Sequence, residues 1–303
     1  MHHDHDRRIF LKNASAVIGS SFLATKSFSN INEFVTANNQ SFTVKQVIDI
    51  ILKEVPDFSR PTTVDQLRSG SMEQEVTGIV TTMFPTLEVI EKTAKAGANF
   101  IIAHETPFYN NNDETEWLKD DDAYKYKVDL LNKYKIAIWR FHDHWHAHKP
   151  DGIAMGNLMK FGWEKYYNPD MPRMITLPKP MTIQSIATLA KQKLGISMVR
   201  VVGNLKQECS TIYLAFGYMD PRAQIPVIQK NKPDLILSGE TREWETVERV
   251  RDGLLMGQKT SLLVLSHSVS EEAGMEYAVS WLKPKLPGVK IMNIPSGNPF
   301  VFV

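Results

Sequence analysis

Short apolar runs alternate with segments of helical periodicity along most of this chain, and the alternation restricts the folds that it can adopt. The apolar runs, typical of buried strands, include "NFIIAH" at 99–104, "KIAIWRFH" at 135–142, "DLILSG" at 234–239 and "SLLVLSH" at 261–267. Between such runs, apolar residues recur at helical spacing, as in Val44 to Glu54 and Pro85 to Ala96. We therefore predict an α/β protein, with a layered α/β/α fold that has two similar halves and mixed sheets.

A proline-rich stretch, Asn168 to Pro180, interrupts this pattern and is our candidate for the crossing between the halves. We predict an N-terminal α/β half over residues 41–170 and a C-terminal α/β half over residues 171–303, joined in one compact unit. With 303 residues, of which 43% are hydrophobic, the chain is long enough to bury one large core or two modest ones.

The first forty residues carry the features of an export signal. In "DRRIFLKNASAVIGSSFLA", two arginines precede "IFLK" and an apolar stretch, Ala14 to Ala24, that is too short for a mature membrane span. This pattern resembles a twin-arginine signal, so we expect a signal and linker over residues 1–40 and a periplasmic or secreted protein. No cysteine follows the stretch, and we expect no stable membrane anchor after signal removal. The alternative is an amphipathic helix with two solvated arginines.

Charge and cysteine content exclude several classes of function. The 35 lysines and arginines nearly balance the 34 aspartates and glutamates, and no basic stripe with interleaved aromatic residues is present, so we expect no nucleic-acid partner. The single cysteine, Cys209, can form neither an internal disulfide nor a thiolate zinc site. Any metal ion must therefore be held by histidine and carboxylate.

Side chains that commonly bind metals follow three of the predicted strands. His104 and Glu105 follow one strand, and His267 closes another, with Glu271 four residues later. Four of the nine histidines follow the third strand: His142, His144, His146 and His148. Ligand sites in open α/β sheets gather at the carboxyl ends of strands. A lone histidine there is usually an ordinary polar residue, but three such strand ends together favour a metal site between the two halves.

The histidine cluster and the Glu271 region leave alternatives open. On an extended segment, four histidines at every second position would lie on one side. Because Pro150-Asp151-Gly152 marks the end of the strand, we expect one or two of them to be ligands and the others to orient ligands or bind substrate. Glu271 suits a metal ligand, and it also suits a residue that complements a helix dipole.

Four blocks of sequence follow one another in a characteristic order. They are "EVTGIVTTMFPTLEVIEKTAKAGANFIIAHETPFYN", "FHDHWHAHKPDGIAMGNLMKFGW", "DLILSGETREWETVERVRDG" and "LVLSHSVSEEAGMEYAVSWLKPKLPGVKIMNIPSGNPF". Together they cover about Glu75 to Phe300 and resemble the NIF-three-like dinuclear metal-centre family, often labelled type-two GTP cyclohydrolase I homologues, in its short form without an inserted domain. The resemblance implies a two-metal centre and a homo-oligomer such as a hexamer.

The resemblance also implies a set of metal ligands, with two departures in this chain. The family's paired histidines become His104 and Glu105, and His146 stands where the family uses aspartate, four residues after His142. Glu105 adds a carboxylate where the family has a histidine, and His146 removes one where the family has an aspartate. The set therefore still contains two carboxylates. We expect two divalent transition-metal ions, such as zinc, iron, manganese or nickel. The expected ligands are His104, Glu105, His146, His267 and Glu271, the last as a bridge.

Two adjacent divalent ions favour hydrolysis of a small-molecule substrate by an activated water. We expect His142 and His144 to donate to an oxyanion or leaving group. Glu240 either shuttles a proton, accepts a hydrogen bond from a ligand or caps the next helix. The family label implies opening of the GTP purine ring, but the chain has neither G-x-G-x-x-G nor a P-loop. The alternatives are a metal-binding or metal-delivery protein without turnover and an interaction protein with a vestigial site.

Overall fold

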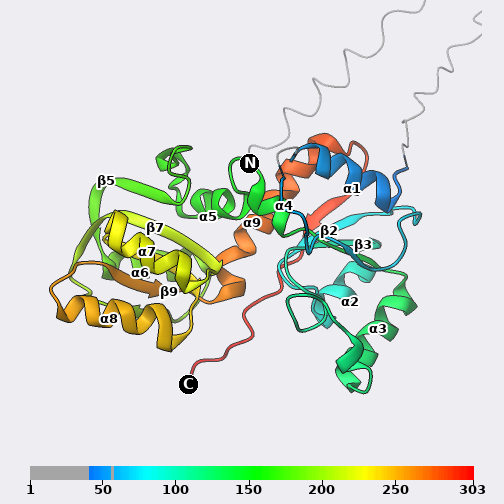
Figure 1. Ribbon diagram of the computed structural model, residues 1–303. Coiled ribbons are helices and arrows are strands. Elements are labelled where there is room, and N and C mark those ends of the chain that lie inside the picture. Colours follow the sequence, from blue (N-terminus) through cyan, green and yellow to red (C-terminus); the bar gives the residue numbers. More distant parts are fainter. Residues whose placement is uncertain (1–40, 56–57) are drawn as a thin grey trace, which may run out of the picture. The chain divides into compact units, whose positions relative to one another are not determined.

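The computed structural model describes residues 41–55 and 58–303, which form two mixed five-stranded sheets. The first sheet has the strand order β1-β4-β3-β2-β10, and the second has the order β5-β7-β8-β9-β6 (Figure 1). The predicted signal and linker over residues 1–40 lie outside the described residues. Among the described helices, none is both long and apolar enough to cross a membrane.

The first sheet is parallel except at one edge, where β1 runs antiparallel to β4. Its strands are β1 (Leu67–Ser69), β2 (Ile79–Thr82), β3 (Phe100–Ala103), β4 (Ala137–Arg140) and β10 (Ile291–Asn293). Both faces are covered: Phe100 and Ile102 pack with α1 (Val44–Lys53), whereas Ile101 packs with α2 (Leu87–Lys95) and α3 (Asp122–Tyr134). Burial on both faces explains why these strands read as continuous apolar runs.

The second sheet has a parallel centre, formed by β7, β8 and β9, between two antiparallel edge strands. Its strands are β5 (Met174–Thr182), β6 (Arg200–Val202), β7 (Glu208–Tyr218), β8 (Leu235–Glu240) and β9 (Ser261–Val264). Residues of α6 (Ile183–Leu194) pack on one face with Ile212 and Leu214. Residues of α7 (Pro221–Asn231) and α8 (Glu248–Leu255) pack on the other with Tyr213.

Helix α9 (His267–Leu282) contacts strands of both sheets, β2 and β10 as well as β7 and β8. It also packs closely on α5 (Gly152–Phe161), where a Cβ atom on Gly156 would lie 2.4 Å from the carbonyl oxygen of Ala273. The remaining helical segments are α4 (Asp143–Ala147), η1 (Glu116–Leu118), η2 (Glu164–Tyr166), η3 (Glu243–Val247) and η4 (Lys283–Lys285). The α9 helix therefore connects the two sheets through buried contacts.

The predicted α/β class with mixed sheets is confirmed, and two details differ from the sequence pattern. The proline-rich stretch overlaps strand β5, at the edge of the second sheet, where proline is tolerated because one side of the strand needs no ladder donor. Strand β10, from the end of the chain, pairs with β2 and so belongs to the first sheet (Figure 1). The segment after residue 170 thus contributes to both sheets, and residues 40–303 form one compact unit.

Candidate metal centre

The ends of strands from both sheets bring six histidine and glutamate side chains together. His104 and Glu105 follow β3, and His142 follows β4. Helix α4 then carries His146, while the first turn of α9, directly after β9, carries His267 and Glu271. The three strand ends singled out in the sequence therefore meet at one site.

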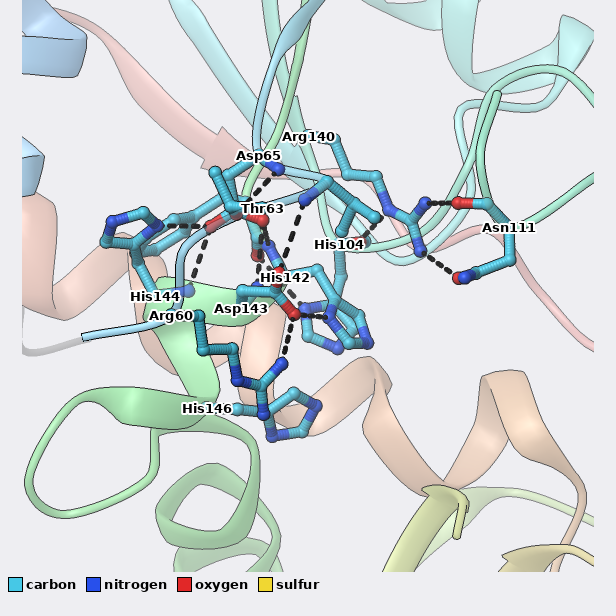
Figure 2. A network of polar contacts seen from close by, with 12 residues as sticks. Arg60, Thr63, Asp65, His104, Asn111, Arg140, His142, Asp143, His144 and His146 are labelled. Carbon is cyan, nitrogen blue, oxygen red and sulfur yellow. Dashed lines mark hydrogen bonds and ion pairs between the residues drawn. The ribbon is translucent and has the colours of Figure 1, made fainter. Parts of the chain in front are cut away.

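Residues 142–148 do not continue the strand, because Asp143–Ala147 form the short helix α4. Helical spacing places His142 and His146 on one face, with ring centroids 4.9 Å apart. The Asp65 carboxylate fixes this turn by accepting hydrogen bonds from the backbone N–H groups of residues 142, 143 and 144 (Figure 2). A side chain 77 positions upstream of His142 therefore determines the local conformation.

His144 and His148 are not brought to the site. His144 Nδ1 lies 2.7 Å from Asp65 Oδ2, and its ring stacks on Phe58 at a centroid distance of 3.9 Å. His148 Nδ1 lies 2.8 Å from the carbonyl oxygen of Pro150, and its ring contacts Trp145. The expected contact of His144 with substrate therefore has no geometrical support, since the ring is held against other groups.

All six histidines of the described residues have an oxygen atom near Nδ1. The remaining four differ from His144 and His148 in that their Nε2 atoms face the two glutamates of the site. The Nδ1 partners of these four are the Phe141 carbonyl for His104 at 3.1 Å, Asp143 for His142 at 3.1 Å, Asp151 for His146 at 3.0 Å and Glu240 for His267 at 2.8 Å. An imidazole that donates from Nδ1 leaves Nε2 as the free lone pair. This pattern is typical of metal-ligating histidines, which are oriented by a carbonyl or carboxylate.

The four Nε2 atoms converge on the two glutamates. Glu271 Oε2 lies 3.2 Å from His267 Nε2 and 3.6 Å from His104 Nε2, while Glu271 Oε1 lies 3.8 Å from His146 Nε2. Glu105 Oε1 lies 3.5 Å from the Nε2 atoms of both His142 and His267. Glu271 thus presents its two oxygens to different imidazoles, as a bridging carboxylate does.

Burial and unpaired atoms show that the cluster fits a cation. His104 is fully buried and Glu271 is 2% exposed, yet within residues 41–55 and 58–303 neither His104 Nε2 nor Glu271 Oε2 has a hydrogen-bond partner. Buried polar atoms without partners are rare, and an ion is one of the explanations. Two groups of residues each bring three ligand atoms within 4.8 Å of one another. One group is His104, His142 and His146, and the other is His104, Glu105 and Glu271. The residues present therefore suit one or two metal ions.

Arg140 holds Glu105 in place. The guanidinium is completely buried, and its Nη2 donates to Glu105 Oε2 at 2.6 Å, so Oε1 is left to face the histidines. Although burial raises the pKa of Glu105, the neighbouring His267, His142 and Arg140 lower it to about 2. The carboxylate therefore remains charged at neutral pH and is available to a cation.

The pKa values of the histidines reflect the same balance of burial and charge. Burial and the nearby His142 and His146 hold the pKa of His104 well below its usual value, so the ring is neutral. Burial opposes protonation of His267, but Glu105, Glu240 and Glu271 raise its pKa to about 12. Three carboxylates around one imidazole concentrate negative charge, which also favours a divalent cation.

A glycine is required where β7 passes the site. Gly217 has a φ of +65°, and a Cβ atom there would lie 2.0 Å from Glu271 Oε1. Its N–H donates to Ser270 Oγ at 2.9 Å. A larger residue would therefore be strained and would displace the Glu271 carboxylate.

The cluster opens into a cavity of about 860 Å³. His142, His146, His267, Glu105, Glu240 and Glu271 all line it. Glu240 does not lie within the cluster, but it accepts from His267 Nδ1, which agrees with one of its three expected roles. The cavity therefore brings a small molecule next to His142, His146, His267 and Glu271, whereas His104 lies buried behind them.

The sequence pattern did not single out Asp65, Arg140 or Asp151 as residues that orient ligands. Asp151 was visible as part of a Pro-Asp-Gly turn, and its position five residues after His146 was the available signal. Arg140 ends an apolar strand two residues before His142, an unusual place for a buried cation. Asp65 gave no local signal, because its partners are distant in sequence.

Comparison with known proteins agrees with this geometry. A family model described as Duf34/NIF3 (NGG1p interacting factor 3) matches residues 43–299. The chain is 26% identical over 214 residues to a GTP cyclohydrolase 1 type 2 homolog of Clostridium perfringens, a match that covers 68% of this chain and 77% of the relative.

Two solved structures share the fold. Staphylococcus aureus protein SA1388 has a TM-score of 0.68 at 18% identity, with 86% of this chain and 99% of that chain covered. A Bacillus cereus protein related to NIF3 has a TM-score of 0.68 at 16% identity, with 87% and 99% covered. Because the family model spans most of the sequence, including all six residues of the cluster, this chain belongs to the Duf34/NIF3 family.

Proposed function

We propose that this protein is a metal-dependent hydrolase that binds two divalent transition-metal ions. The observation that carries the proposal is the convergence of four Nε2 atoms on Glu105 and Glu271, each imidazole being oriented through Nδ1. The proposed ligands are His104, Glu105, His146, His267 and the bridging Glu271. His142 is either a sixth ligand or a donor to substrate, since its Nε2 faces the Glu105 carboxylate at 3.5 Å.

The bound ions would supply Lewis-acid chemistry, by acidifying a water molecule and by polarising a substrate oxygen. Side chains of the protein orient the proposed ligands. Glu240 holds the proton on His267 Nδ1, and because its side chain is 53% exposed it can exchange protons with solvent. The buried Arg140 prevents Glu105 from turning away from the histidines.

The cavity favours turnover over metal storage. A storage or delivery protein can saturate the coordination of its ion, whereas a hydrolase needs an open position that substrate can reach. Here both Glu271 and His146 line a cavity of about 860 Å³, large enough for a small organic molecule. Metal delivery without turnover remains the alternative function, and it predicts metal binding with no hydrolysis of any substrate.

Metal content and hydrolysis measured on the same preparations test the proposal. The purified chain is stripped of metal, reloaded separately with zinc, iron, manganese or nickel, and assayed on phosphoesters, amides and nucleotides. GTP is included because the curated relatives carry the name GTP cyclohydrolase 1 type 2 homolog. Glu271→Gln is the matched control. Hydrolysis that requires metal and is lost in the control supports the proposal, and metal binding without any hydrolysis supports delivery.

We also propose that the protein is exported and forms a homo-oligomer. The "RRIFLK" pattern supports twin-arginine export, and the family resemblance supports an assembly such as a hexamer. Fractionation of cells that express the wild type or the Arg7→Lys/Arg8→Lys variant tests export. Light scattering on the purified chain tests the oligomeric state, and a monomer at micromolar concentration would contradict it.

A further inference from the structure

Three arginines line the cavity beside the metal centre: Arg60, Arg173 and Arg242. They come from three separate parts of the chain: the segment before β1, the segment before β5 and the end of β8. None of them was singled out in the sequence. Their gathering around one cavity is a feature of the fold that the ligand set does not use.

With respect to the part of the chain that the structure describes, each arginine has hydrogen-bond donors to spare. The acidic partners are Asp143 for Arg60 Nη1 at 2.9 Å, Asp151 for Arg173 Nη2 at 3.7 Å and Glu245 for Arg242 Nη1 at 3.2 Å. In each pair one terminal nitrogen of the arginine contacts the carboxylate. A guanidinium carries five N–H donors in a planar fork. The partners therefore orient the guanidinium groups and leave donors for a ligand.

The acidic residues that line the cavity are engaged elsewhere. Glu105 and Glu271 face the histidines, and Glu240 accepts from His267. Asp220 caps helix α7 by accepting from the N–H of Arg222 at 2.8 Å. Two divalent ions would balance the charge of the four carboxylates of the lining, so the guanidinium donors that the acidic partners leave free would attract an anion.

Aromatic side chains contribute to the lining of the cavity. Phe84, Phe216 and Tyr218 line it, and the Phe84 ring lies 6.1 Å from the His267 ring between centroids. The Arg242 guanidinium carbon lies 5.4 Å from the Tyr218 ring centroid, which places a cation over an aromatic face. A planar or apolar group can therefore pack beside the metal ligands while a charged group contacts the arginines.

From this arrangement we infer that the substrate is an aromatic molecule with an oxyanion group, phosphate or carboxylate, that binds to Arg60 and Arg242 rather than to the metal ions. This inference rests on the proposed function, because it assigns the substrate class of the same site. Planar guanidinium groups bind such oxyanions through paired, charge-assisted hydrogen bonds. Arg173 contributes charge, but it also contacts Asp151, the residue that orients His146.

Titration calorimetry of the metal-loaded full chain with phenyl phosphate tests the inference. The main variant is Arg242→Gln, because its partner Glu245 lies near none of the Nδ1 atoms of the site. The second is Arg60→Gln, whose partner Asp143 also lies near His142 Nδ1, so it is compared with the wild type at equal metal content.

Arg200→Gln is the control, because Arg200 forms an exposed pair with Glu243 outside the cavity. Benzyl alcohol serves as an uncharged ligand with the same ring. Metal content is measured on every sample.

We expect Kd for phenyl phosphate to rise about tenfold in each cavity variant and to stay unchanged in the control, with benzyl alcohol insensitive to all three changes. Equal Kd values in all variants at full metal content would overturn the inference, since the phosphate would then bind through the ions alone. If the chain bound no metal but the arginine variants still weakened phenyl phosphate binding, the anion site would be supported. The proposed two-metal hydrolase would then be refuted.

Discussion

Arg140 Nη2 lies 2.6 Å from Glu105 Oε2, in a contact where the guanidinium is completely buried and the carboxylate nearly so. The same guanidinium donates to Asn111 (Figure 2). It also pairs with Asp113. One oxygen of Glu105 is thereby fixed, and the other faces His142 and His267. A buried cation thus orients the carboxylate that follows His104 in the sequence.

Replacement of Arg140 by methionine should therefore destabilise the protein strongly. Glu105 would lose its guanidinium partner, and among the described residues Asp113 would keep only Arg68 as an ion-pair partner, at 3.0 Å. Breaking a buried pair costs about 3–5 kcal/mol. Urea unfolding of Arg140→Met measures this loss. Arg200→Met, which removes an exposed pair with Glu243, should change the free energy of unfolding by about 1 kcal/mol or less. Equal effects of the two substitutions would contradict a special role for the buried pair.

Asp151→Asn should weaken metal binding while preserving the fold. Asp151 Oδ2 lies 3.0 Å from His146 Nδ1, and Oδ1 accepts from the N–H of Ala154 at the start of α5. Asparagine caps helices as well as aspartate does, so mainly the charge beside His146 is lost. We expect metal affinity to fall about 10- to 100-fold in competition with a chelator.

The control for this variant is Asp121→Asn, at the exposed cap of α3, where Asp121 accepts from the N–H of Tyr124. It should leave metal affinity unchanged. If both variants weakened metal binding equally, orientation of His146 by Asp151 would be excluded as the cause.

Gly217→Ala should destabilise the protein and disturb the centre together. The added Cβ atom would lie 2.0 Å from Glu271 Oε1, in a backbone with φ of +65°. Gly162→Ala provides a matched control, because its φ is +74° and its Cβ atom would meet nothing within 4 Å. The control should lose about 1 kcal/mol of stability and keep its metal. Gly217→Ala should lose both stability and bound metal. Unchanged metal affinity in Gly217→Ala would show that Glu271 is placed incorrectly.

The depressed pKa of the buried Lys127 predicts that the free energy of unfolding rises with pH. Its amino group donates to the carbonyl of Pro107 at 2.7 Å, and burial lowers its pKa from 10.5 to about 8. Between these values the unfolded chain binds more protons than the folded chain, so the free energy of unfolding increases with pH. Relative to Lys127→Met, the wild type should gain on the order of 2–3 kcal/mol between about pH 8 and 10.5 in urea unfolding. A constant difference between the two proteins would contradict the depressed pKa.

The sequence was sufficient to predict the strand ends because hydrophobic periodicity and strand polarity are local properties. His104, Glu105, His267 and Glu271 follow buried apolar runs, and the parallel pairing of β2 with β3 and of β8 with β9 brings such ends to common edges. The alternation of elements also predicted the α/β class with mixed sheets. These parts of the fold depend on hydrophobic patterns within a single strand or helix.

The histidine cluster shows why other parts were beyond prediction. Histidines at every second position suit a strand, and the same spacing includes pairs four residues apart that suit a helix. The choice is made by Asp65, whose carboxylate binds three successive backbone N–H groups of the turn. A contact so distant in sequence leaves no local pattern, and it determines that His142 and His146 face the centre while His144 does not.

The central claim is most directly tested by the metal content of the full chain, purified without a histidine tag, measured by elemental analysis beside Glu271→Gln. The bridging position of Glu271 between His146 and the His104–His267 pair predicts two ions per chain in the wild type and their loss in the variant. Glu276→Gln, on the exposed face of the same helix, should retain both ions. Less than about half an ion per wild-type chain after reloading, with no change in Glu271→Gln, would contradict the dinuclear centre.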